Sequence, residues 1–295
     1  MIRAAVLACT LAACVSTTDD VAPWEPADAI TGRLAPELGP PPPVSAAPST
    51  TLRIATFNVH FGKQPEDLAD AIAHSGQLAT ADVILLQEIE AYPEEPGTRT
   101  RRMAEALGMT WVYAPAREEF DGTHGIAILA RQPLANVQIR QLPFVEQPIR
   151  ERKRIAVEAD VMLGDTAVRI VNVHLDVRIG PVDRIRQLDP AAVDQPDPVV
   201  LGGDFNTNPW AWVDATVPLL ASEAILGQEQ ALVVDDYMFD NGFTGAIGID
   251  TSTLRLPAFQ MRTDDLYARG LHVVASGIDT VDGSDHWPVW IDVSN

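Results

Sequence analysis

The stretch PVVLGGDFNT, residues 198–207, decides the fold of this chain of 295 residues. Its apolar half predicts a buried strand, because short apolar runs bounded by proline and glycine are typical of strands in a sheet core. Asp204 and Asn206 lie two residues apart, so in an extended segment their side chains point to the same face. At the C-terminal end of a strand that face can open onto a cleft, which makes the pair a candidate functional site.

Four further segments end an apolar run with Asp, Glu, Asn or His. They are TFNVH (56–60), LQE (86–88), VNVHL (171–175) and SDHWP (284–288). Carboxylate and amide oxygens bind hard metal ions, and carboxylates and imidazoles transfer protons. Five such segments in one chain therefore indicate a site that combines a metal ion with a base.

The intervening sequence alternates between strand-like and helix-like patterns. We expect strands over 51–60, 82–87, 126–130, 155–163, 168–175, 198–203, 264–268 and 287–293. Helices are expected over 65–76, 98–108 and 183–188, whereas 208–261 has no regular pattern. This mixture predicts one α/β domain of two packed β-sheets with helices on the outside.

The N-terminus predicts export. Residues 1–13 have a signal-peptide pattern, with Arg3 before an apolar stretch that is too short to span a membrane. The stretch ends in Leu11-Ala12-Ala13-Cys14, which resembles a bacterial lipobox and implies cleavage before Cys14 and lipidation of that cysteine. The alternative is an ordinary secretory signal with a chance cysteine. Proline-rich residues 14–50 predict an extended, unpacked tether, and 51–295 form the domain.

We therefore expect a lipoprotein of the cell envelope, at the outer membrane if the host has one, or else a secreted protein. The lipid would be its only membrane contact, since no apolar run of about 20 residues follows the leader. Both cysteines, Cys9 and Cys14, lie in the first fourteen residues, so the domain has no disulfide and no cysteine zinc site.

The charge balance weighs against polyanionic partners. The chain has 41 acidic and 21 basic residues and a net charge of −20, so it repels nucleic acids at long range. Tight duplex binding draws on Lys and Arg contacts to phosphates. Nucleic acid remains a possible but disfavoured partner, and we expect a monomer.

The ordered residues at these five segments, together with the segment Arg262-Thr263-Asp264-Asp265-Leu266, resemble the endonuclease/exonuclease/phosphatase superfamily, the fold of deoxyribonuclease I. The matching set is Asn58, Glu88, His174, Asp204, Asn206, Asp264, Asp285 and His286. The resemblance covers 51–295 and implies a four-layer α/β sandwich of two mixed sheets flanked by helices. It also implies hydrolysis of a phosphodiester or phosphomonoester by in-line attack of water, with Mg²⁺ or Mn²⁺ as cofactor.

The resemblance further implies a role for each side chain. Glu88 would bind the metal, helped by Asn58 and Asp285. Asp204 and Asn206 would position the attacking water and a phosphate oxygen. His286 would hold the phosphate or share the role of base, oriented by Asp264, and His174 would contact a phosphate oxygen or protonate the leaving group.

Some assignments stay open. Asp265 rivals Asp264, although an offset of one residue turns it to the opposite face of a strand. Arg154 stands where relatives place an arginine near the phosphate, and His124 is a second candidate for substrate contact. His60 stands where some family nucleases carry a metal-associated Asp, which weakens a second metal position and a nuclease activity.

Two function classes compete. The first is an exported, membrane-tethered phosphoesterase, whose substrate could be a nucleic acid, a phospholipid head group or a small phosphate ester; an extracellular endonuclease on DNA or RNA is the variant of this class. The second is a catalytically inactive surface-binding module on the same fold. Such a module would be expected to have lost core residues, and all of them are present.

Overall fold

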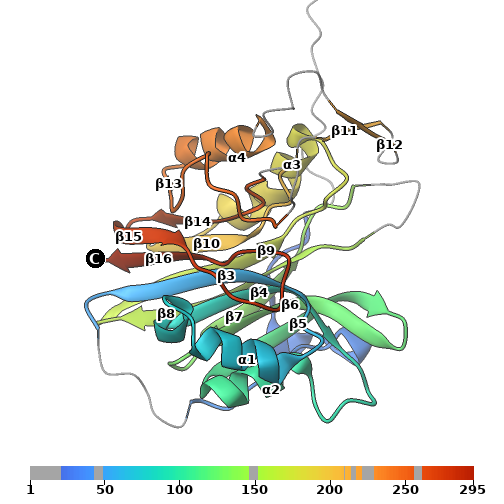
Figure 1. Ribbon diagram of the computed structural model, residues 1–295, viewed down its shortest axis with the longest axis vertical. Helices are drawn as coiled ribbons and strands as arrows, with labels where there is room; N and C mark the ends of the chain where they lie inside the picture. Colours follow the sequence, from blue (N-terminus) through green and yellow to red (C-terminus); the bar gives the residue numbers. More distant parts are fainter. Residues whose placement is uncertain are drawn as a thin grey trace, which may run out of the picture.

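The computed structural model describes residues 21–42, 49–145, 152–208, 210–213, 217–220, 229–255 and 261–295. The predicted signal peptide and Cys14 lie outside the described residues. Two seven-stranded β-sheets pack face to face, and helices cover their outer surfaces (Figure 1). This arrangement confirms the predicted four-layer α/β sandwich. Within the described part of the chain, no helix is long and apolar enough to cross a membrane.

The first sheet has the strand order β1-β7-β8-β9-β10-β14-β13. Its strands are β1 (Glu25–Pro26), β7 (Ala135–Gln141), β8 (Ile155–Leu163), β9 (Thr166–His174), β10 (Val199–Asp204), β14 (Asp264–Arg269) and β13 (Thr244–Gly245). Strands β9 and β10 run parallel, and the other pairs are antiparallel.

The second sheet has the order β15-β16-β3-β4-β6-β5-β2. Its strands are β15 (His272–Ile278), β16 (Val289–Ser294), β3 (Leu52–Phe61), β4 (Val83–Ala91), β6 (Gly122–Ala130), β5 (Thr110–Glu119) and β2 (Glu37–Leu38). Here β3 and β4 are the parallel pair. A separate antiparallel pair consists of β11 (Trp210–Val213) and β12 (Val217–Leu220).

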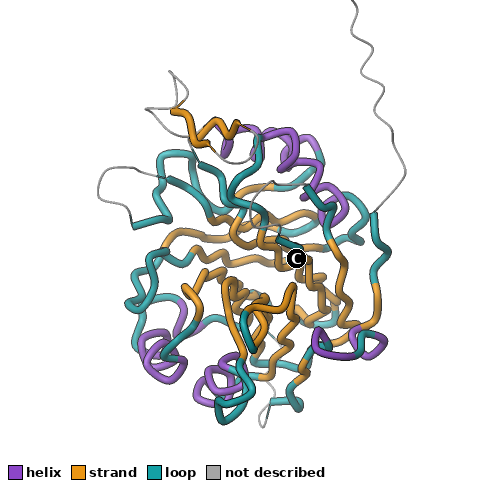
Figure 2. Tube along the Cα trace, turned by 90° about the vertical axis from the view of Figure 1, so that its right-hand side faces the viewer, coloured by secondary structure: helices purple, strands orange, loops and turns teal. Residues whose placement is uncertain are grey.

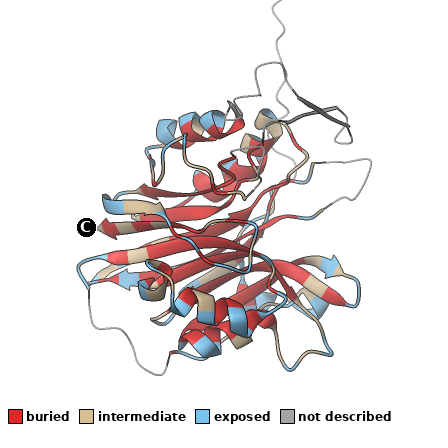
Figure 3. Ribbon diagram, viewed as in Figure 1, coloured by how far each residue is buried: buried red, intermediate tan, exposed pale blue. Residues whose placement is uncertain are grey.

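Apolar side chains fill three layers between these elements. The central layer lies between the two sheets and includes Leu85, Val157 and Ile291, all of which are fully buried. Helices α1 (Pro65–Ala73) and α2 (Arg99–Leu107) close a second layer on the second sheet, and α3 (Pro181–Ala192) and α4 (Glu229–Asp240) close a third on the first sheet. Figure 2 shows the two sheets enclosed by helices, and Figure 3 shows that burial follows the strands.

Parallel pairing brings the important strand ends together. The C-terminal ends of β3, β4, β9 and β10 lie at one end of the sandwich, which we call the site end. In Figure 1 it is the right-hand end, opposite the C-terminus, because β3 runs antiparallel to β16. The β5–β6 turn and the start of β8 also lie there, since β5 and β6 pair antiparallel next to β4 and β8 pairs antiparallel with β9.

Over the described residues 24–42, the proline-rich segment packs on the domain, whereas an unpacked tether was expected over 14–50. Strand β1 pairs with the edge strand β7, and β2 pairs with the edge strand β5. Trp24 lies 4.7 Å from the guanidinium of Arg140, and Ala27 is buried. We call residues 24–42 the N-terminal strap. The composition was misleading because proline is compatible with sheet edges, where no donor is needed on the open side.

Other boundaries also differ from expectation. Residues 208–261, expected to lack regular structure, contain β11, β12, α4 and β13. Strands β5, β7 and β15 were not predicted, and α3 extends over Pro181–Ala192, where only 183–188 was expected. In contrast, the helix expected over 98–108 is α2, where the Thr98 hydroxyl accepts a hydrogen bond from the Arg101 amide and Gly108 ends the helix in a left-handed conformation.

Candidate active site

Strand geometry places five polar side chains at the site end. Asp204 ends β10 directly beside His174, which ends β9. Gly203 permits this close approach, because a Cβ at that position would lie 1.9 Å from the Val173 carbonyl oxygen. On the second sheet, Asn58 of β3 pairs with Gln87 of β4. The regular pairing of both strands is interrupted by a bulge at this point, between Asn58 and Phe61 in β3 and between Leu86 and Ile89 in β4. Glu88 lies in one of these bulges with φ +55°, a conformation that is rare for a side-chain-bearing residue.

Asp204 is fixed by contacts from both sheets. The Asn58 amide donates a hydrogen bond to its Oδ2 at 2.9 Å, and the Asn206 backbone donates to its Oδ1 at 2.8 Å. Asn206 adopts φ +53°, and its side-chain amide donates to the Leu175 carbonyl. Backbone strain of this kind persists where the surrounding contacts over-determine it, as at functional sites.

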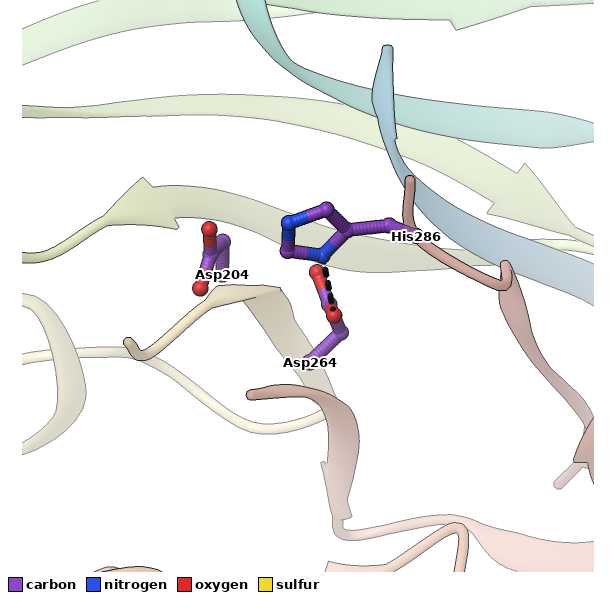
Figure 4. Close-up of side chains that lie close together, drawn as sticks. All are labelled: Asp204, Asp264 and His286. Atoms are coloured by element: carbon purple, nitrogen blue, oxygen red, sulfur yellow. Dashed lines mark hydrogen bonds and ion pairs between the residues drawn. The ribbon is translucent and has the colours of Figure 1, made fainter. Parts of the chain in front are cut away.

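His286 faces Asp204 and is held by Asp264 (Figure 4). Its Nδ1 lies 2.7 Å from Asp264 Oδ2, and the Thr263 hydroxyl donates to the same oxygen. One potential metal-ligand atom from each of Asp204, Asp264 and His286 lies within 4.8 Å of the others. Asp265, the rival from the sequence, faces away and pairs with Arg262 at 3.0 Å, as the strand alternation requires.

Burial and mutual charge shift the pKa values of this cluster. Burial, together with the charge of Asp264, raises the pKa of Asp204 to about 7. Burial alone would lower the pKa of His286, but the carboxylates of Asp264 and Asp204 outweigh it and raise that pKa to about 10. At neutral pH the structure therefore holds a protonated imidazole beside a carboxylate that can take up or release a proton.

His174 links the two sheets of the site. Its Nε2 lies 3.6 Å from Asp204 Oδ2 and 3.9 Å from Glu88 Oε1. Burial, with a contribution from the positive charge of Arg154, lowers the pKa of His174 well below its usual value, so the ring is neutral. The Nε2 atom is buried and has no hydrogen-bond partner among the described residues. A buried polar atom without a partner at such a site is typical of a ligand-binding position.

A cleft of about 510 Å³ opens beside this cluster. Glu88, Asp285 and His286 line it, and the exposed His60 and Asp285 approach each other to 3.1 Å between Nδ1 and Oδ1. His124 lines the same cleft, its Nδ1 lies 3.7 Å from Glu90 Oε1, and burial lowers its pKa. Of the sequence-predicted metal residues, Glu88 and Asp285 thus lie on the open side, whereas Asn58 is buried next to the proton-transfer residues.

Arg117 and Arg152 form the basic wall of the cleft, whereas the sequence predicted Arg154 at this place. Arg154 is buried and donates to Asp176 at 2.9 Å, whereas Arg117 and Arg152 line the cleft. Burial and repulsion from Arg154 lower the pKa values of both Arg117 and Arg152. The Arg117 Nη1 atom is buried without a hydrogen-bond partner among the described residues. A phosphate in the cleft would meet Arg117 and Arg152 before Arg154.

Comparison with known proteins agrees with this geometry. Residues 55–286 match the endonuclease/exonuclease/phosphatase family. The chain belongs to that family. No curated protein sequence matches the chain.

Solved structures of this family share the fold at low sequence identity. A family protein from Leptotrichia buccalis has 16% identity and a TM-score of 0.62, covering 83% of this chain and 100% of its own. A mannosyl-6-phosphatase from Bacteroides thetaiotaomicron has 15% identity and a TM-score of 0.52, covering 83% and 100%. ANGEL2, a 2′,3′-cyclic phosphatase, has 14% identity and a TM-score of 0.56, covering 82% and 95%.

Members of this family are hydrolases of phosphate esters and generally depend on a divalent metal. The donors here fit a hard cation, because Glu88 and Asp285 offer carboxylates on the cleft and Asn58 offers an amide oxygen. The Asn58 Oδ1 already accepts the His60 amide, which leaves one lone pair. The compact Asp204–Asp264–His286 group is a poorer cation site, since a protonated imidazole has no lone pair to give.

Sequence reasoning missed Gln87 and Asn172, which hold the two sheets of the site together. The Gln87 amide donates to Thr56 and to Asn172, and the Asn172 amide donates to the carbonyls of Leu86 and Ala127 on the other sheet. Arg184, fully buried, donates to the carbonyls of Asp176 and Phe205 and so joins the loops after β9 and β10. The signal for Gln87 and Asn172 was a polar residue inside an apolar strand run.

Proposed function

We propose that this chain is an exported phosphoesterase that uses Mg²⁺ or Mn²⁺ to hydrolyse a phosphodiester or phosphomonoester. One observation carries the proposal: a buried carboxylate, Asp204, lies beside the His286–Asp264 pair at the inner edge of a cleft with both acidic and basic walls. Hydrolysis of a phosphate ester requires a proton acceptor for water and positive charge around the phosphate. The site supplies both within one cluster.

Each side chain has a distinct task in the proposed reaction. Asp204, with its pKa near 7, accepts a proton from the attacking water as the new oxygen–phosphorus bond forms. His286, kept protonated by Asp264, donates a hydrogen bond to a phosphate oxygen. Arg117 and Arg152 balance the negative charge that grows as the ester bond breaks and the leaving oxygen departs.

The remaining polar groups bind and orient. The free Nε2 of His174 is placed to contact a phosphate oxygen or the leaving oxygen. Asn206 holds Asp204 through its backbone amide. Glu88, with Asn58 and Asp285, would hold the divalent ion, which neutralises the phosphate and activates the leaving oxygen when bound.

Location and tethering rest on the sequence. The leader and Cys14 support export and lipidation, and thereby a place in the cell envelope. The net charge of −20 disfavours a nucleic-acid substrate. His60 also disfavours a nuclease, because some family nucleases carry a metal-associated Asp at this position. The relatives described as a mannosyl-6-phosphatase and a 2′,3′-cyclic phosphatase support a phosphate ester as the substrate.

The decisive test is hydrolysis of two chromogenic esters by the full chain. We expect release of p-nitrophenol from bis-p-nitrophenyl phosphate, from p-nitrophenyl phosphate, or from both, in the presence of Mg²⁺ or Mn²⁺. EDTA should abolish it and added metal should restore it. A well-folded chain that hydrolyses neither ester, nor plasmid DNA, sphingomyelin or inositol phosphates, with either metal would refute the enzyme assignment and favour the binding module.

A further inference from the structure

Four exposed apolar side chains lie on segments at the site end. Phe120 is 85% exposed at the β5–β6 turn, and Val182 is 80% exposed in the first turn of α3, just after the loop that follows His174. Phe144 is 39% exposed in the segment after β7, where the Pro143 carbonyl accepts a hydrogen bond from Gln187. Together with Val21, 55% exposed, they form what we call the apolar rim.

Phe120 is a poor choice for the turn that carries it. Glu119 pairs with Gly122, so Phe120 and Asp121 are the two central residues of a tight hairpin. Phe120 adopts φ +51°, a conformation that favours glycine at this position. A bulky aromatic residue is strained there and, with its side chain in solvent, gains no burial in return. Folding does not explain the residue, which points to a role in binding.

The chain enters the domain at the same end. Glu25 pairs with Ile139 and Pro26 with Gln138, in antiparallel register. Residues before Glu25 therefore run toward the C-terminal end of β7, which lies at the site end because β8 begins there. Only residues 15–20 separate Cys14 from Val21. At roughly 3.5 Å per residue, these seven links reach at most about 25 Å.

Other exposed apolar residues lack this setting. Leu232, Val233 and Phe239 lie on α4, and Val274 lies on the edge strand β15. These four side chains do not line the cleft, whereas Phe120 does. The rim combines apolar side chains, the cleft mouth and the point where the chain enters the domain.

We propose that the apolar rim docks on a lipid bilayer, so that the cleft faces the membrane surface. The inference rests on the proposed function and specifies its substrate as a phosphate ester presented at the membrane interface. The net charge of −20 opposes attraction to anionic lipid, so the contact rests on apolar insertion. Phe120 lines the cleft as well, and its insertion would bring the cleft mouth to the headgroups.

The test is flotation with phosphatidylcholine vesicles, which does not depend on activity. We use residues 15–295, because all three apolar layers and the strap lie within them and the leader would itself bind lipid. Wild-type protein should float with vesicles both at low ionic strength (about 50 mM NaCl) and at high ionic strength (about 500 mM NaCl). Phe144→Ser with Val182→Ser should lower the partition coefficient by about tenfold, while hydrolysis of soluble p-nitrophenyl esters stays unchanged.

Two further variants complete the design. Phe120→Gly should also weaken flotation, yet leave the melting temperature equal or higher, because glycine accepts the positive φ without strain. Phe239→Ser with Val274→Ser is the matched control and should float like wild type.

Three results would overturn docking on a bilayer. The first is no flotation of the wild-type chain, whether or not it hydrolyses esters. The second is equal loss in the control variant. The third is a dimer in solution that Phe144→Ser with Val182→Ser dissociates, since a second copy would then be the occupant of the rim. Loss of ester hydrolysis with intact flotation would instead remove the proposed enzyme and leave the docking surface.

Discussion

The site has two sides that differ in their access to water. On the buried side, Asp204, Asp264 and His286 are almost wholly enclosed, and their charges act on one another across a few ångströms of protein. On the open side, Glu88 and Asp285 face a cleft together with arginines. Burial makes charges interact strongly and moves pKa values, whereas exposed carboxylates stay hydrated and can exchange water for a cation. The difference suggests proton transfer on one side and metal and phosphate binding on the other.

Removing the buried groups should have the largest effect. Asp204→Ala or His286→Ala should lower kcat by about 10³-fold or more, because each deletes a proton acceptor or a charge placed at the reacting phosphate. Steady-state rates on a p-nitrophenyl ester, with circular dichroism to verify folding, measure this. Asp282→Asn, at an exposed carboxylate near the site in sequence, is the control. Near-normal rates in either alanine variant would remove these residues from the mechanism.

The buried side also predicts a pH profile. The base form of Asp204 is required, and burial raises its pKa to about 7, so kcat/KM should rise with pH through that value. His286 must stay protonated, so kcat/KM should fall again near pH 10. At pH 5, two pH units below the pKa of Asp204, we expect kcat/KM to be about 100-fold lower than at pH 8. A profile that is flat from pH 5 to 8 would contradict the role of Asp204 as base.

The open side should respond to metal concentration instead. Glu88→Gln keeps the shape but removes a charge, so the Mg²⁺ concentration for half-maximal activity should rise by about tenfold or more, with partial recovery at saturating metal. Titration of activity with Mg²⁺ measures it, and Glu94→Gln on a nearby exposed loop is the matched control. An unchanged metal requirement would place the ion elsewhere.

The adjacent pair Asp264 and Asp265 gives the sharpest contrast between two neighbouring residues. Asp264→Asn should reduce activity by about 10²-fold with little change in stability, because it removes the partner of His286. Asp265→Asn should spare activity but lower the free energy of unfolding by about 3 kcal/mol, because it breaks a buried ion pair with Arg262. Thermal melts and rates on both variants measure this. If the two variants exchanged effects, the assignment of the orienting residue would be wrong.

Much of the buried side could be predicted from sequence. Asp204 and His286 belong to the polar segments that end apolar runs, and the family resemblance pointed to Asp264, while strand alternation implies that Asp264 and Asp265 face opposite ways. The basic wall could not be predicted, because Arg117 belongs to β5, a strand whose apolar pattern was overlooked, and a single arginine in a strand has no local signal. The strap was missed because a proline-rich segment is compatible with both a free tether and an edge strand.

The sequence by itself determined the layered α/β fold, the family and the residue types of the site, because hydrophobic periodicity and strand-end polar residues are local properties. Tertiary structure decided which side chains meet. The bulges at Asn58 and Glu88, the Gln87–Asn172 contact between the sheets and the return of the strap to the site end all depend on pairing between distant segments. Burial, which sets the pKa values of Asp204 and His286, exists only once the two sheets have packed.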